Sequence, residues 1–116
     1  MNQFRLDDYK VSPENKVAKR VIFNDGQVLA FVLNIAEGQQ LPPHTHFDST
    51  VLLQVLKGEA VVLIDDKSVK MAEGDLLQLD GQEEMVVNNT GQDVLELYVT
   101  ISPTPPDEKY TVDANL

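Results

Sequence analysis

The stretch GQQLPPHTHFDSTVLLQVLKG, residues 38–58, decides how this chain folds. Its two histidines, His44 and His46, follow Gly38 closely and precede an apolar run that ends at Gly58. On a β-strand, residues i and i+2 point to the same side of the sheet, about 7 Å apart along the strand. These two histidines are the only ones in the chain. They can therefore converge on one metal ion or one ligand.

Outward from this stretch, apolar segments of strand length alternate with short turn sequences. The expected strands span residues 17–24, 27–36, 50–56, 59–64, 67–71, 76–79, 85–87 and 94–101. Because helical periodicity is hard to find, the pattern predicts an all-β barrel or sandwich. Asp25-Gly26 is typical of a two-residue hairpin turn. Three prolines end regular structure after residue 102, and the tail that follows is expected either to be loose or to dock on a neighbour.

Length and composition limit the kinds of protein this chain can be. Its 116 residues fit one domain, with a core at about 17–101, an N-terminal arm and a proline-rich C-terminal tail. No apolar run approaches 18 residues and no signal peptide is visible, so no membrane partner is expected. Cysteine is absent, which excludes disulfides and suits a cytoplasmic location. A net charge of −10 argues against nucleic-acid binding.

The segment 27–36 is apolar on both of its faces. One face carries Leu29, Phe31, Leu33 and Ile35, and the other carries Val28, Ala30 and Val32, followed by Asn34. A strand of this kind is covered on both sides. A second sheet or a partner subunit must supply the second cover, and two-fold dimers are the commonest assemblies. The sequence therefore predicts a homodimer.

Two spaced motifs resemble those of the cupin superfamily, which are double-stranded β-helix, or jelly-roll, barrels. The first family motif is Gly, His-x-His, Glu and Gly, and four of its positions are matched by Gly38, His44, His46 and Gly58. The second motif begins with glycine and ends with asparagine, matched by Gly74 and Asn89. The resemblance covers roughly residues 31–101 and implies a jelly-roll barrel for most of the chain.

The departures from the family pattern bear on function. Val51 stands at the glutamate position of the first motif and Met85 at the histidine position of the second. The family metal site usually has three histidines and one carboxylate, so the resemblance implies that only His44 and His46 remain as metal ligands. Valine cannot ligate, and a thioether is a weak, soft ligand. The expected cofactor is therefore none, or a weakly bound divalent ion such as zinc, nickel, manganese or iron.

The resemblance places His44, His46, Val51 and Met85 at one site, and Leu53 lies on the same strand face as Val51. These five residues form the predicted ligand-binding pocket, in which Val51 and Leu53 are either pocket lining or core. We favour a small-molecule-binding or sensing cupin whose metal site is partly lost. One alternative is a metal-dependent enzyme of the dioxygenase or isomerase type that uses both histidines. This enzyme would need a carboxylate ligand from Asp48 or Glu83. Both residues are instead expected to be solvent-exposed charges in loops. A second alternative is a metal-free, epimerase-like enzyme.

Overall fold

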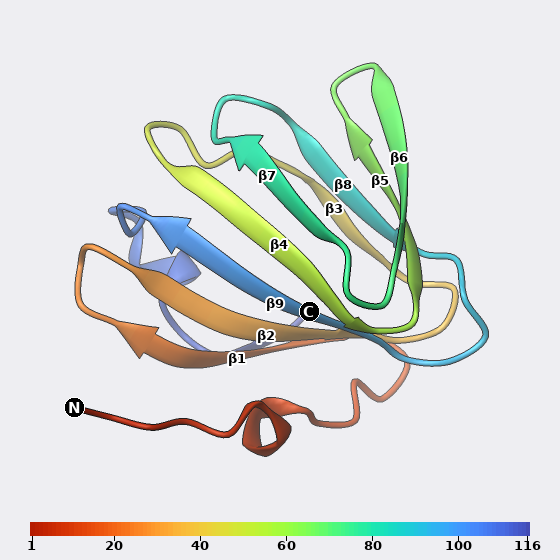
Figure 1. Cartoon of the computed structure of the whole chain (residues 1–116), viewed down its shortest axis with the longest axis horizontal. Helices are drawn as coiled ribbons and strands as arrows, with labels where there is room; N and C mark the ends of the chain where they lie inside the picture. Colours follow the sequence, from red (N-terminus) through yellow and green to blue (C-terminus); the bar gives the residue numbers. More distant parts are fainter.

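The computed structural model describes all 116 residues, and the chain forms two antiparallel sheets around one apolar core (Figure 1). The larger sheet has the order β10-β1-β2-β9-β4-β7, with β10 (Ala114–Asn115), β1 (Val17–Asn24), β2 (Leu29–Ile35), β9 (Leu95–Ser102), β4 (Thr50–Lys57) and β7 (Leu76–Asp80). The smaller has the order β3-β8-β5-β6, with β3 (Gln40–His44), β8 (Met85–Asn89), β5 (Glu59–Ile64) and β6 (Lys67–Ala72). Two short 3-10 helices, η1 (Leu6–Tyr9) and η2 (Glu108–Tyr110), lie outside the sheets.

Alternation along the strands explains why the two sheets pack together. In β4, Val51, Leu53 and Val55 are almost fully buried, whereas Leu52 between them is 39% exposed. The same period of two runs through β5, β8 and β9. Each sheet therefore presents one apolar face to the other. The all-β jelly-roll class predicted from the sequence is confirmed. None of the helices has the length and apolar character needed to cross a membrane.

The turn between β1 and β2 is wider than the sequence predicted. Asn24 pairs with Leu29, so four residues form the loop and not two. Gly26 has a φ of +85°, but Asp25 does not enter the left-handed region. The Asp25 carboxylate accepts hydrogen bonds from the backbone N–H groups of Gln27 and Val28, both at 2.9 Å. These bonds stabilise the wider turn, a role that aspartate commonly takes in loops.

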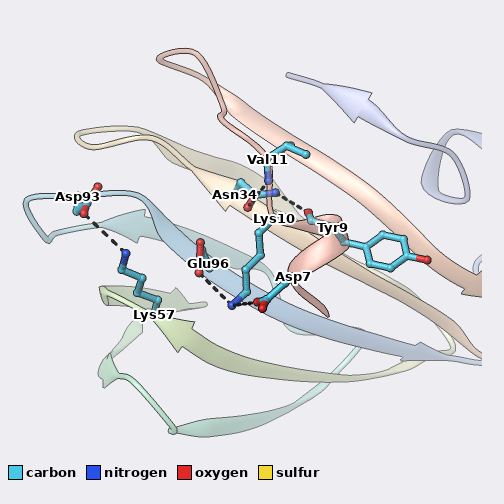
Figure 2. A network of polar contacts seen from close by, with 8 residues as sticks. All are labelled: Asp7, Tyr9, Lys10, Val11, Asn34, Lys57, Asp93 and Glu96. Atoms are coloured by element: carbon cyan, nitrogen blue, oxygen red, sulfur yellow. Dashed lines mark hydrogen bonds and ion pairs between the residues drawn. The ribbon is translucent and has the colours of Figure 1, made fainter. Parts of the chain in front are cut away.

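The outer face of β2 is covered in part by the chain's own N-terminal arm, residues 1–16. Asn34 points to this face and is fully buried. Its side chain accepts a hydrogen bond from Val11 N and donates one to the carbonyl of Tyr9, and Lys10 pairs with Glu96 on β9 (Figure 2). The Asn34 amide also donates to the carbonyl of Ala18. The arm supplies part of the cover that the sequence assigned to a second sheet or a partner subunit. The homodimer stays a prediction, for light scattering to test, and the apolar β2 strand alone no longer requires it.

The C-terminal tail folds back onto the same barrel. Its final strand, β10, pairs with β1, and Leu116 N donates to Val17 O at 2.7 Å. Thr104 N also donates to the carbonyl of Gly26 in the β1–β2 loop. The tail is therefore neither loose nor reserved for a neighbour. It extends the larger sheet by one edge strand and brings residues 109–116 across one end of the barrel, where they line a cavity.

Candidate ligand-binding site

A cavity of about 470 Å³ lies inside the barrel, between the larger sheet, β3 and the C-terminal tail. Its inner wall is apolar and consists of Phe31, Leu33, Leu53, Met85, Val99 and Ile101. These side chains come from β2, β4, β8 and β9, and all face inward by strand alternation. The volume falls in the range of about 300–1,000 Å³ that is typical of small-molecule sites. The mouth is lined by the tail, with Val112 and Leu116 each about half exposed.

His44 and His46 both line this cavity, although only His44 lies on a strand. β3 ends at His44, after an irregularity at Pro42-Pro43, and His46 follows in the loop toward β4. Their rings meet edge to face with centroids 4.9 Å apart. The predicted convergence of the two histidines is thus present, but it comes from a strand end and a loop and not from one continuous strand.

Both imidazoles are held in the neutral form at neutral pH. Burial lowers the pKa of His44 from its usual value of 6.5. Burial, together with the nearby His44 and Lys19, lowers the pKa of His46 to about 4. His44 Nδ1 lies 2.8 Å from the carbonyl oxygen of Pro42 and therefore carries the proton and donates. This leaves His44 Nε2 with a free lone pair, while His46 Nδ1 is buried with no hydrogen-bond partner.

A lysine and a tyrosine complete the polar side of the cavity. Lys19, on β1, is only 8% exposed, and its Nζ donates to the carbonyl oxygen of Tyr110. The same ammonium lies 4.6 Å from the centroid of the Phe31 ring, a favourable cation–π position. The Tyr110 ring packs edge-on against His46, with centroids 5.1 Å apart. Burial lowers the pKa of Lys19, and the attraction of Asp113 opposes this effect.

The loop that carries His46 is positioned by a close approach to Gly81. His46 N donates to Gly81 O at 2.9 Å, and Gly81 N donates to Ser49 O at 2.8 Å. A Cβ atom on residue 81 would lie 1.8 Å from the carbonyl oxygen of His46 and 2.4 Å from that of Ser49. Only glycine leaves room for this backbone contact. The β7–β8 turn thereby sets the position of the histidine loop.

Four of the five residues assigned to the pocket line the cavity: His44, His46, Leu53 and Met85. Met85 also pairs with His44 across β3 and β8. The fifth, Val51, takes the core position that the sequence left open. It is 2% exposed and packs in the core between its strand partners Leu79 and Ile101. It shares the inward face with Leu53 but lies two residues earlier on β4 and does not line the cavity.

The donor set does not fit the metal site of the family. No group of three or more His, Cys, Asp or Glu residues comes close enough to hold a metal ion. Neither Asp48 nor Glu83 lines the cavity, and Glu83 instead accepts a hydrogen bond from Asp80 N within its own turn. Two imidazoles fall short of the four ligands of a structural zinc site and the three protein ligands of a catalytic one.

Sequence reasoning missed Lys19, Tyr110 and Gly81. Lys19 lies on β1, and β10 covers the edge of that strand. One signal was available, because Lys19 alternates with Val17 and Val21 on the inward face of β1. Tyr110 carries no such signal, since it reaches the site only through the course of the tail.

Fold and site together define a double-stranded β-helix barrel with an apolar internal cavity and a histidine pair at its polar side. A cupin domain family model matches residues 31–101, from β2 to β9. The chain therefore belongs to the cupin family. It is 26% identical over 102 residues to the uncharacterised protein MJ0764 of Methanocaldococcus jannaschii, a match that covers 87% of this chain and 86% of that protein.

Solved structures agree with this assignment. The protein TT1209 from Thermus thermophilus superposes with a TM-score of 0.83 at 25% identity, over 90% of this chain and 100% of that one. A conserved protein with a double-stranded β-helix domain from Klebsiella pneumoniae gives a TM-score of 0.81 at 18% identity, over 87% and 84% of the two chains. The second likeness shows the fold alone.

Proposed function

We propose that this cupin binds a small organic molecule with an apolar body inside its barrel, in place of a metal centre. The observation that carries the proposal is the cavity of about 470 Å³, whose deep wall is apolar and whose polar groups gather on one side. This is the usual anatomy of a small-molecule site, in which apolar burial supplies affinity and a few polar groups fix orientation. His44 Nε2 is the acceptor that its bond to Pro42 leaves free.

A neutral apolar dye tests the proposal. N-phenyl-1-naphthylamine, which fluoresces when it leaves water, should bind saturably at one molecule per chain. Leu53→Trp places a larger side chain on the inner wall, so the ligand can bury less of its apolar surface in the cavity. Binding should therefore weaken by at least ~10-fold. Leu52→Trp is the matched control, since Leu52 lies on the outer face of the same strand. Unsaturable dye fluorescence, or equal loss in both variants, would contradict the proposal.

The second proposed property is weak metal binding. Calorimetry of the parent chain with zinc should show no tight site, because two imidazoles leave the ion short of protein ligands. Met85→His adds a third imidazole directly opposite His44 in the β3–β8 register, and should raise zinc affinity by roughly 100-fold. Met71→His places the same group at a buried position away from the cavity and should leave the affinity unchanged. Tight binding of one zinc ion per parent chain would overturn this property.

A metal-free enzyme is the alternative that one observation supports. His44 is oriented through Nδ1 and stays neutral, so Nε2 has the protonation state of a general base. Its orienting partner is a backbone carbonyl and not a carboxylate. The geometry therefore supports ligand binding more directly than proton transfer, and the binding proposal is the one we adopt.

A further inference from the structure

Lys19 is a buried cation with few partners inside the protein. Its Nζ makes one hydrogen bond, to the carbonyl of Tyr110, and it takes part in none of the salt bridges of the chain. An ammonium carries three donors, so two remain after the Tyr110 bond. A buried charge without a counter-ion costs stability, and that cost falls when an anion pairs with it.

The charge of the cavity is opposite to that of the protein. The chain carries a net charge of −10, yet no aspartate or glutamate lines the cavity. The two charged lining residues are Lys19 and Lys109, both cationic. Lys109 is largely exposed and pairs with Asp107 at 3.7 Å, which leaves Lys19 as the desolvated charge. Asp113 attracts Lys19 but is exposed and accepts a hydrogen bond from Val21 N at 2.6 Å.

The position of Lys19 places its charge next to apolar surface. Its ammonium lies over the ring of Phe31, and Phe31 belongs to the apolar inner wall. A ligand that reaches Lys19 therefore has its remaining atoms against hydrocarbon side chains. The neighbouring imidazoles are neutral at pH 7 and add hydrogen-bonding groups without a second charge.

We infer that the ligand of this cavity is a monocarboxylate with an apolar body, whose carboxylate pairs with Lys19 while its hydrocarbon part packs against Phe31, Leu53 and Val99. The inference rests on the proposed function, because it names the class of molecule that the cavity binds. A charge-assisted bond to a buried ammonium is among the stronger polar contacts in proteins. Aliphatic and aromatic acids share this chemistry.

Calorimetry at pH 7 with 4-phenylbutyrate and 4-phenylbutanamide tests the inference, since the two probes have the same length and differ in charge. The parent should bind the carboxylate at least ~10-fold more tightly than the amide. Lys19→Met should abolish that preference, because it removes the charge and keeps the volume. Lys16→Met is the control, since Lys16 is exposed and lies outside the cavity; it should retain the preference. Thermal unfolding of each variant checks that it folds.

The other outcomes separate the inference from the proposed function. Equal affinity for the two probes in the parent would overturn the monocarboxylate inference and leave the apolar binding site standing. A preference for the carboxylate that survives Lys19→Met would also overturn it, because the charge would then lie elsewhere. If neither probe binds while the neutral dye does, the monocarboxylate inference alone is overturned. Failure of both probes and of the dye overturns the proposed function as well.

Discussion

Gly81→Ala should lower the free energy of unfolding by about 3 kcal/mol or more, the largest effect that we expect from a single methyl group in this protein. The added Cβ would lie 1.8 Å from the carbonyl oxygen of His46, a distance that no side-chain adjustment relieves. The loop must move, and the hydrogen bonds that join residue 81 to His46 and Ser49 would break. We therefore also expect ligand binding to be lost at temperatures where the variant is still folded.

Gly91→Ala is the matched control for this prediction. Neither glycine needs a positive φ, and a Cβ at residue 91 would meet its nearest atoms at 3.6 Å, an ordinary contact. Its free energy of unfolding should change by less than about 0.5 kcal/mol. Urea unfolding of the two variants measures both values. Equal stability of Gly81→Ala and the parent would show that the His46 loop does not approach the β7–β8 turn so closely.

Lowering the pH should destabilise the fold through His46, and this effect should begin at a pH well above the usual pKa values of carboxylates. The pKa of His46 is about 4 in the folded chain and 6.5 in its ordinary state. Between these values the unfolded chain binds a proton that the folded chain does not, so the free energy of unfolding falls as the pH falls. The loss begins near pH 6.5 and is complete below pH 4, where it reaches roughly 3 kcal/mol. About one pH unit above 6.5 and higher, His46 is neutral in both states and contributes no pH dependence.

Urea unfolding of the parent and His46→Asn between pH 7.5 and 4 measures this contribution. The variant lacks the imidazole, so its stability should fall less steeply over the window, and the difference isolates His46 from the carboxylates. His44 adds a smaller effect of the same sign, because burial lowers its pKa too. Parallel curves for the two proteins would mean that His46 is not buried as the structure shows.

The fold could be predicted from the sequence because the patterns that determine it are local. Alternation in the segments around Leu53 and Leu97, with glycine-containing turns between strands, predicts strands that must pair and bury one face. The motif spacing then predicted the cupin barrel, and the family match bears this out. The predicted two-residue turn at Asp25 was wrong. The width of this turn depends on the register of β1 and β2, which the local sequence does not determine.

The candidate site could be predicted only in part, because segments distant in the sequence complete it. His44, His46 and Met85 were placed together from the motifs and Leu53 from strand alternation, and all four line the cavity. The contribution of the tail could not be predicted, since no pattern in residues 103–116 indicates that β10 returns to pair with β1. That return covers Lys19 and brings Tyr110 next to His46. Long-range pairing of this kind is a property of the folded chain and not of a sequence window.

Methyl-resolved NMR during titration with N-phenyl-1-naphthylamine tests the central claim, that the barrel holds an organic ligand, most directly. Ligand in the cavity should shift the methyl signals of Leu33, Leu53 and Met85, which line it. The signals of Leu52 and Leu76, which are 39% and 61% exposed on the outside of the barrel, should not move. Saturable shifts confined to the first group are the expected result. Shifts confined to Leu52 and Leu76, or no saturable shift at all, would contradict it.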